Sequence, residues 1–207
     1  MDRRSFIKNS LATAVAIGCG AALGPLAGPS SAQGQPLRPP GARSEDEFLS
    51  KCIRCMRCVD ACPNQAIIPL DGASSPRLQS TPAIKARRQA CMLCNKIDGD
   101  YLKCTEACPT GALQLVPKDP DEIQAKVSMG VAEIDTSLCY SYNNRSCGVC
   151  YWACPFAGKA IHLGMWEKPK VDADACIGCG LCERACIRYP QAIRVRPGPR
   201  AEGVKNS

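Results

Sequence analysis

The cysteines of this chain are spaced as metal ligands usually are. Of its 17 cysteines, sixteen fall into four groups of four. The groups are Cys52, Cys55, Cys58 and Cys62; Cys91, Cys94, Cys104 and Cys108; Cys139, Cys147, Cys150 and Cys154; and Cys176, Cys179, Cys182 and Cys186. Groups one and four follow the C-x2-C-x2-C-x3-C spacing that binds [4Fe–4S] clusters. Groups two and three keep four cysteines and the following proline, with one longer gap each.

This spacing has a physical reason. Three cysteines two residues apart wrap a loop around one cubane, and the fourth, at the start of a helical turn, reaches a neighbouring cluster. Glycines such as Gly178 and Gly180 let backbone N–H groups approach the cluster sulfurs. We therefore predict that all sixteen cysteines are ligands and that they hold four [4Fe–4S] clusters.

Composition and charge argue against other uses of these cysteines. Eight disulfides would not need one motif four times, and zinc ribbons use paired short gaps without a third cysteine at the same interval. The formal net charge of +7 falls to about +5 without the first residues. Four oxidised clusters with their thiolates would add about −8, so no nucleic-acid partner is needed to explain the basic residues.

Residue patterns typical of enzymes are missing from the sequence. It has no phosphate loop, dinucleotide fingerprint or arrangement of a nucleophile with histidine,. If every cysteine is a ligand, no cluster iron is open to a substrate. The pattern predicts an electron carrier without catalytic residues.

A repeat extends beyond the cysteines. A short apolar segment follows each group, at 66–68, 112–115, 160–163 and 192–195, and further segments precede groups three and four, at 134–135 and 171–172. Strand, cluster loop, short helix and strand make the half-unit of a two-cluster ferredoxin. We predict a small, loop-rich α+β fold of two such units, tandem or nested, over residues 45–196.

Several single features complete the expected domain. The order Asp119-Pro120 predicts the start of a helix. Residues 69–82 are rich in Gly, Ser and Pro and are predicted to form a loop. His162 occupies a strand position at which an exposed side chain is expected. A basic patch before group two either docks an acidic partner or lipid headgroups or is a solvated face; it consists of Lys85, Arg87 and Arg88. Aromatic residues gather around group three and are expected to shield clusters from water; they are Tyr140, Tyr142, Tyr151, Trp152 and Trp166.

The N-terminus resembles a twin-arginine export signal. Arg3-Arg4 precedes an apolar stretch shorter than the roughly 20 residues of a spanning helix, and small residues end at Ala32,. We predict a signal peptide at 1–32, a linker at 33–44, a flexible tail at 197–207 and a periplasmic protein. Cys19 is either lipid-modified or a small apolar residue of the discarded signal. Because this route exports folded proteins, clusters can be inserted in the reducing cytoplasm.

The leader, the segment Leu37–Ala42 and the four gap patterns together resemble the NapG/MauM family of ferredoxin-type proteins over nearly the whole chain. The resemblance implies relay of electrons from a membrane-bound quinol dehydrogenase to a periplasmic oxidoreductase such as nitrate reductase, with peripheral membrane association left open. For the MauM branch it implies a maturation or assembly factor for methylamine dehydrogenase instead. The loop after Ile68 departs from the family.

The resemblance also implies a nested pairing of the groups, one with four and two with three. Cys186 would then complete the cluster of Cys52, Cys55 and Cys58, and Cys62 that of group four. Likewise, Cys154 would serve group two, and Cys108 group three. Consecutive pairing, one with two and three with four, remains the alternative.

Overall fold

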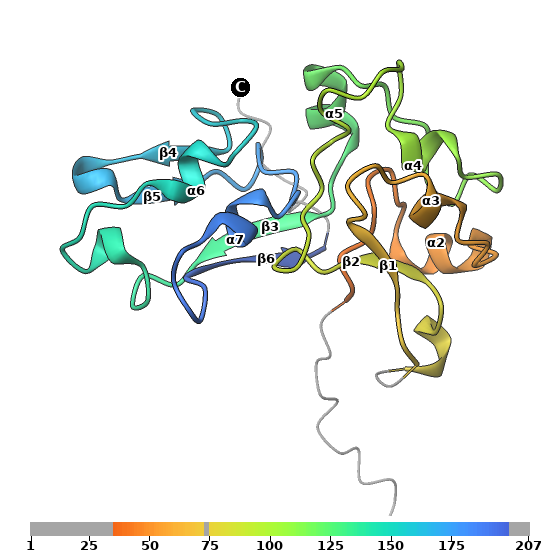
Figure 1. Cartoon of the computed structure of the whole chain (residues 1–207), viewed down its shortest axis with the longest axis horizontal. Helices are drawn as coiled ribbons and strands as arrows, with labels where there is room; N and C mark the ends of the chain where they lie inside the picture. The colour runs from red at the N-terminus through yellow and green to blue at the C-terminus, as the bar shows by residue number, and fades with distance from the viewer. Residues whose placement is uncertain (1–34, 73–74, 199–207) are drawn as a thin grey trace, which may run out of the picture. The chain divides into compact units, whose positions relative to one another are not determined.

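Three short antiparallel strand pairs organise residues 35–72 and 75–198, which the computed structural model describes. Strand β1 (Ile67–Pro69) pairs with β2 (Pro82–Ile84), and β4 (Ile161–Leu163) pairs with β5 (Pro169–Val171). The longest pair joins β3 (Gly130–Ile134) to β6 (Ile193–Pro197), which Figure 1 shows side by side. The predicted signal peptide, Cys19 and most of the predicted tail lie outside the described residues.

Short helices connect these strands. They are α2 (Glu45–Lys51), α3 (Arg57–Asp60), α4 (Lys103–Glu106), α5 (Pro120–Lys126), α6 (Val149–Trp152) and α7 (Leu181–Ala185). The predicted start of α5 is confirmed, because the Asp119 side chain accepts hydrogen bonds from the backbone of Asp121 and Glu122 at its N-terminus,. In the described ranges, no helix has both the length and the apolar character needed to cross a membrane.

The predicted strands are confirmed except after group two. The segments 66–68, 160–163 and 192–195 contribute to β1, β4 and β6, and those before groups three and four end β3 and β5. The segment 112–115 forms no strand; Leu113 makes only an isolated bridge to Ala42. This bridge shows that the partner of 112–115 is the segment before α2.

The two halves of the domain therefore repeat one arrangement. In the second half the order is β3, group three, β4, β5, group four and β6, with β3 paired to β6. In the first half, residues 37–42, here called the N-terminal strap, take the place of β3 and are bridged to Leu113. The expected α+β fold of two ferredoxin-like units is confirmed, and the units are tandem.

The strap differs from the predicted linker at 33–44. Leu37, Pro39 and Pro40 are buried. The Ile84 backbone N–H donates to the Leu37 carbonyl at 2.7 Å, and that of Gln114 to the Gly41 carbonyl at 2.7 Å. Apolar burial and paired backbone groups make the strap part of the core, so the folded domain begins before Glu45.

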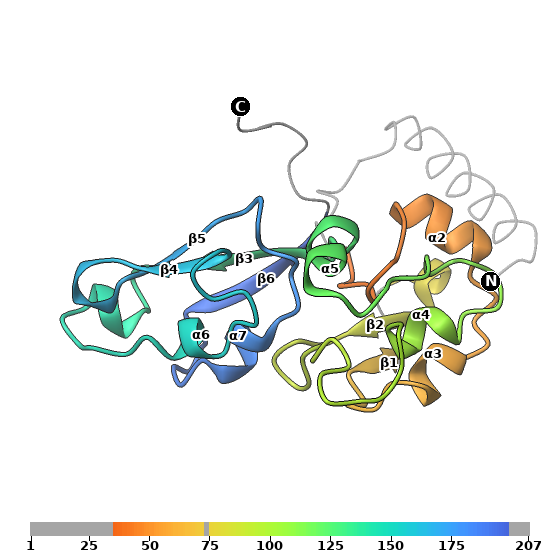
Figure 2. The ribbon, with the colours of Figure 1, turned by 90° about the horizontal axis from the view of Figure 1, so that it is seen from above.

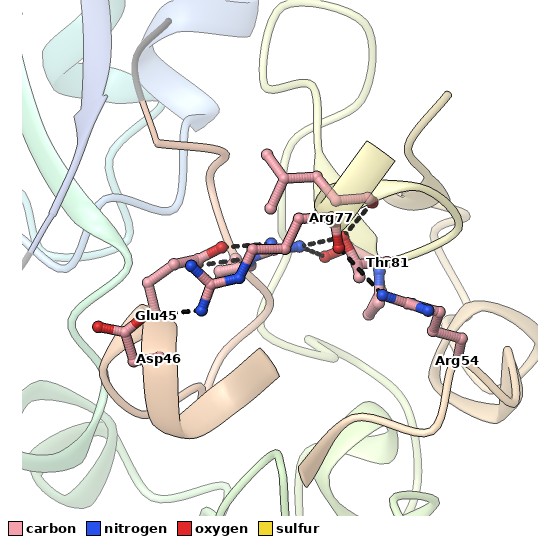
Figure 3. Close-up of polar contacts among 8 residues, drawn as sticks. Glu45, Asp46, Arg54, Arg77 and Thr81 are labelled. Carbon is pink, nitrogen blue, oxygen red and sulfur yellow. Dashed lines mark hydrogen bonds and ion pairs between the residues drawn. The ribbon is translucent and has the colours of Figure 1, made fainter. Parts of the chain in front are cut away.

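Arg38 fixes the strap from within. Its guanidinium, in a residue only 5% exposed, donates to Glu45 at 2.9 and 2.5 Å and to the Thr81 hydroxyl at 2.9 Å. It also lies 4.7 Å from the centre of the Phe48 ring. Figure 3 shows Glu45 and Thr81 next to a separate, exposed pair in which Arg77 contacts Asp46 at 2.8 Å. Arg38 thus joins α2 to the loop before β2.

In each half, the two helices that follow the cysteine loops pack together. Helix α3 contacts α4, and α6 contacts α7. Figures 1 and 2 show both pairs from two directions. Since each helix carries cysteines, this packing decides which groups meet.

Candidate iron–sulfur sites

The structure gathers the sixteen cysteines into four quartets. Site A consists of Cys52, Cys55, Cys58 and Cys108; site B of Cys62, Cys91, Cys94 and Cys104; site C of Cys139, Cys147, Cys150 and Cys186; and site D of Cys154, Cys176, Cys179 and Cys182. In sites B, C and D the four residues line one cavity. In site A, the three other thiols are those that act electrostatically on Cys58. Each quartet combines three cysteines of one group with the fourth of another.

The nested pairing implied by the resemblance is wrong, and the alternative, consecutive pairing, is observed. Cys108 joins group one and Cys62 joins group two, while Cys186 joins group three and Cys154 joins group four. The physical reason is the packing of α3 on α4 and of α6 on α7. The cysteine that follows each of these helices therefore joins the quartet of the packing partner's loop.

The cysteine loops of groups one and four share an unusual backbone conformation. Arg54 and Met56 have φ of 56° and 62°, and the equivalent Gly178 and Gly180 have φ of 73° and 82°. Left-handed residues between the cysteines turn the loop so that three thiols face one point. Group four needs glycine for a second reason: a Cβ on Gly178 would lie 2.4 Å from the Gly130 nitrogen.

Burial dominates the electrostatics of the quartets. Burial first, and then the neighbouring thiols Cys52, Cys108 and Cys55, raise the pKa of Cys58 to about 11. Burial likewise raises the pKa of Cys150 to about 11 and that of Cys179 to about 12. Such thiols are protonated in the bare protein at neutral pH. Metal binding must therefore displace protons, as expected for thiolate ligation.

Backbone N–H groups point at the cysteine sulfurs. Ala66 donates to Cys62 Sγ at 3.3 Å, Lys103 to Cys94 Sγ at 3.4 Å and Leu113 to Cys108 Sγ at 3.4 Å. These donors stabilise negative sulfur, and such bonds tune iron–sulfur clusters. Ala66 and Leu113 lie on the segments that follow groups one and two, and Lys103 is the first residue of α4; the sequence did not mark any of the three as functional.

The quartets fit [4Fe–4S] clusters better than other uses of cysteine. All sixteen are free thiols in the described structure. Within the same residues, no group of three or more His, Cys, Asp or Glu side chains is arranged to hold a single metal ion. Four thiols facing one cavity, with N–H donors to the sulfurs, match the ligand set of a cubane, which lies between its ligands.

The environment of site C corrects the expectation for the aromatic residues. Trp152 is 79% exposed and Trp166 75% exposed, so these two do not shield a cluster. Tyr140, Tyr142 and Tyr151 are half-buried. His162 is exposed on β4, as predicted.

The basic patch before group two is not only a solvated face. Arg87 Nη1 donates to the backbone carbonyls of Glu183, Arg184 and Cys186 at 3.1, 3.1 and 2.8 Å. Sequence reasoning missed this role because the three acceptors lie in the other half of the chain.

Models of iron–sulfur domains match both halves. A 4Fe–4S dicluster domain matches residues 51–112, and a 4Fe–4S binding domain matches residues 168–193. The first match spans groups one and two together, as the consecutive pairing requires. The chain thus contains [4Fe–4S]-binding domains of the ferredoxin type.

Relatives cover most of the chain. It is 38% identical over 179 residues to the methylamine utilization ferredoxin-type protein MauM of Methylobacillus flagellatus, covering 83% of this chain and 72% of that protein. It is 37% identical over 216 residues to the ferredoxin-type protein NapG of Haemophilus influenzae, covering 98% and 74%. For NapG of Escherichia coli the identity is 35% over 212 residues, covering 97% and 88%. The chain therefore belongs to the NapG/MauM family of ferredoxin-type iron–sulfur proteins, which are electron-transfer proteins.

Proposed function

We propose that this protein relays electrons through four [4Fe–4S] clusters from a membrane-bound quinol dehydrogenase to a periplasmic oxidoreductase such as nitrate reductase. The observation that carries the proposal is the assembly of four separate cysteine quartets, in which each of the sixteen cysteines of the four groups is used once. Each cluster would supply one-electron redox chemistry.

The chain's own residues would hold and tune these centres. The quartets provide four thiolates per site, which leaves no ligand position for a substrate. Backbone donors such as those of Ala66 and Leu113 would stabilise the more negative, reduced state,. Burial of Cys104 and Cys182 keeps water from the sulfurs. These features serve electron transfer and not bond-making chemistry.

Metal analysis tests the ligand assignment. About sixteen iron atoms and sixteen acid-labile sulfides per chain are expected for four cubanes. Zinc, or eight disulfides in place of iron, would overturn the proposal. In a second step, the purified quinol dehydrogenase should reduce the protein, and the terminal reductase should reoxidise it.

The second candidate function is a maturation factor for a periplasmic redox enzyme. It is favoured by the similarity to a protein named for methylamine utilization. A deletion strain separates the two functions. Loss of a relay protein leaves the partner enzyme fully active with an artificial electron donor. Loss of a maturation factor leaves that enzyme inactive with any donor.

The proposed location is the periplasm, reached through the twin-arginine route. The Arg3-Arg4 pair of the sequence supports it. Substitution of both arginines by lysine should leave the iron-loaded protein in the cytoplasm, as fractionation would show. Unchanged export would refute the assignment of the leader.

A further inference from the structure

Contacts between the two halves bring site B next to site D. The backbone N–H of Cys91, in site B, donates to the carbonyl of Cys179, in site D, at 3.0 Å. The path from one sulfur to the other therefore runs through two cysteine residues and crosses one hydrogen bond.

The segment 85–91 forms this contact together with the loop 179–186. Gly180 packs against Ala86 so closely that a Cβ on Gly180 would lie 2.4 Å from the Ala86 Cβ. Arg87 donates to three carbonyls at the end of α7, the last of which belongs to Cys186 of site C. One short segment of the first half thus touches residues of both second-half sites.

Contacts within each half link site A to site B and site C to site D. Sites A and B share the packed helices α3 and α4, and sites C and D share α6 and α7. Cys104 of site B has Cys58 of site A among its electrostatic neighbours, and Cys182 of site D has Cys150 of site C among its own. The contacts therefore run from A to B, from B to D and from D to C.

We infer that the four sites form one linear series in the order A, B, D, C, and that Ala86, Arg87 and Gly180 are positioning residues that set the separation of B and D. This inference rests on the proposed function and adds the internal route. Clusters held in these sites would pass one electron at a time between neighbouring sites: the donor would be oxidised and the acceptor reduced by one electron, and no bond would form or break.

The sites differ in how far their cysteines are exposed. Cys55 in site A is the one exposed cysteine among the described sixteen, and Ile53 beside it is 63% exposed. Site D holds three buried cysteines, Cys176, Cys179 and Cys182. Site A is therefore more accessible than site D to an electron donor or acceptor.

The contact between the segment 85–91 and the loop 179–186 is here called the joint. A matched pair of glycine substitutions tests it in the full-length, iron-loaded protein. Gly180 and Gly158 both have φ of +82°, but a Cβ on Gly158 would meet nothing within 4 Å. Gly180→Ala and Gly158→Ala thus add the same backbone strain, and only the first forces the halves apart. Adding Ala86→Gly to Gly180→Ala removes the colliding atom and should restore the wild-type properties. Arg87→Gln, which changes no residue of a cysteine loop, provides a second route to the same test.

Two measurements report on the joint. Electron paramagnetic resonance of protein treated with a strong one-electron reductant detects spin coupling between neighbouring clusters. Hydrogen exchange followed by mass spectrometry reports on the Cys91 amide. In Gly180→Ala and Arg87→Gln we expect weaker coupling and exchange of that amide at least about tenfold faster. Iron per chain should be unchanged in Arg87→Gln, whose substitution lies outside the cysteine loops.

The outcomes separate this inference from the proposed function. If both test variants show the same spin coupling and amide exchange as Gly158→Ala, the inference is overturned. The proposed clusters and the proposed relay are not affected by that result. Iron loss in Arg87→Gln would also overturn it, because Arg87 would then be needed to hold a cluster and would not only set the separation of two sites. A wild-type protein without iron would instead refute the proposed function, and the exchange measurement would still decide whether the joint exists.

Discussion

Hydrogen bonding distinguishes Cys108 from the buried thiols of the other sites. Burial raises the pKa of Cys108, but the backbone N–H groups of Leu113, Thr110 and Ala112 and the Thr110 hydroxyl together bring that pKa below its usual value. The Thr110 oxygen lies 3.8 Å from the sulfur. Since reduction adds negative charge to a cluster and its thiolates, these donors favour the reduced state of site A.

Removing the hydroxyl should therefore lower one reduction potential. Thr110→Val is expected to shift the potential of a single cluster by about 20–40 mV to more negative values, because one weak donor to charged sulfur is lost. A redox titration followed by electron paramagnetic resonance would measure the shift. Thr136→Val, at an exposed threonine outside the four quartets, is the control and should leave every potential in place. A positive shift in Thr110→Val would contradict the assigned role.

The buried guanidinium of Arg38 should contribute more to the stability of the fold than the exposed guanidinium of Arg77. Arg38→Met leaves the Glu45 carboxylate and the Thr81 hydroxyl without their donor, which is expected to cost about 3 kcal/mol and to lower Tm by roughly 6–12 °C. Arg77→Met breaks an ion pair whose side chains are 65% and 88% exposed and should cost less than about 1 kcal/mol. Loss of the visible iron–sulfur absorbance on heating would compare the two. Equal losses would show that Arg38 does not hold the strap.

At the scale of elements, the sequence predicts what depends on local pattern. The alternation around groups one, three and four gives strands where β1, β4 and β6 are found, and Asp119-Pro120 marks the start of α5. The N-terminal strap was not foreseen. It has no alternating pattern and carries two prolines, and its burial depends on the distant residues Ile84 and Gln114. Only its position before group one, matching that of β3 before group three, gave a signal.

The strap should be sensitive to one methyl group at Gly41. A Cβ there would lie 2.4 Å from the Gln114 carbonyl oxygen, whereas one on Gly111 would meet nothing within 4 Å. Both glycines have positive φ, +76° and +67°, so Gly111→Ala controls for backbone strain. Gly41→Ala should speed hydrogen exchange of the Gln114 amide and lower Tm by several degrees more than Gly111→Ala. Matching behaviour of the two variants would mean that the strap does not pack against Gln114.

For the whole molecule, the identity of the ligands follows from spacing but their partners do not. Three cysteines separated by two residues each face one cluster, and this does not depend on how the rest of the chain packs. The destination of the fourth, such as Cys62, depends on which helix packs against its own, and that contact joins residues far apart in sequence. The structure pairs α3 with α4 and α6 with α7, and this packing replaces the nested arrangement with a tandem one.

Double substitutions distinguish the two arrangements directly. In the tandem arrangement Cys55 and Cys108 serve the same site, so Cys55→Ala with Cys108→Ala should disable one cluster, with loss of about four iron atoms at most. Cys55→Ala with Cys62→Ala changes two residues of one group that serve sites A and B, and should disable two clusters, with loss of about eight. Iron analysis and quantitative electron paramagnetic resonance of both variants would count the clusters that remain. In a nested arrangement Cys55 and Cys108 would serve different clusters, so damage to two clusters in the first variant would refute the tandem pairing.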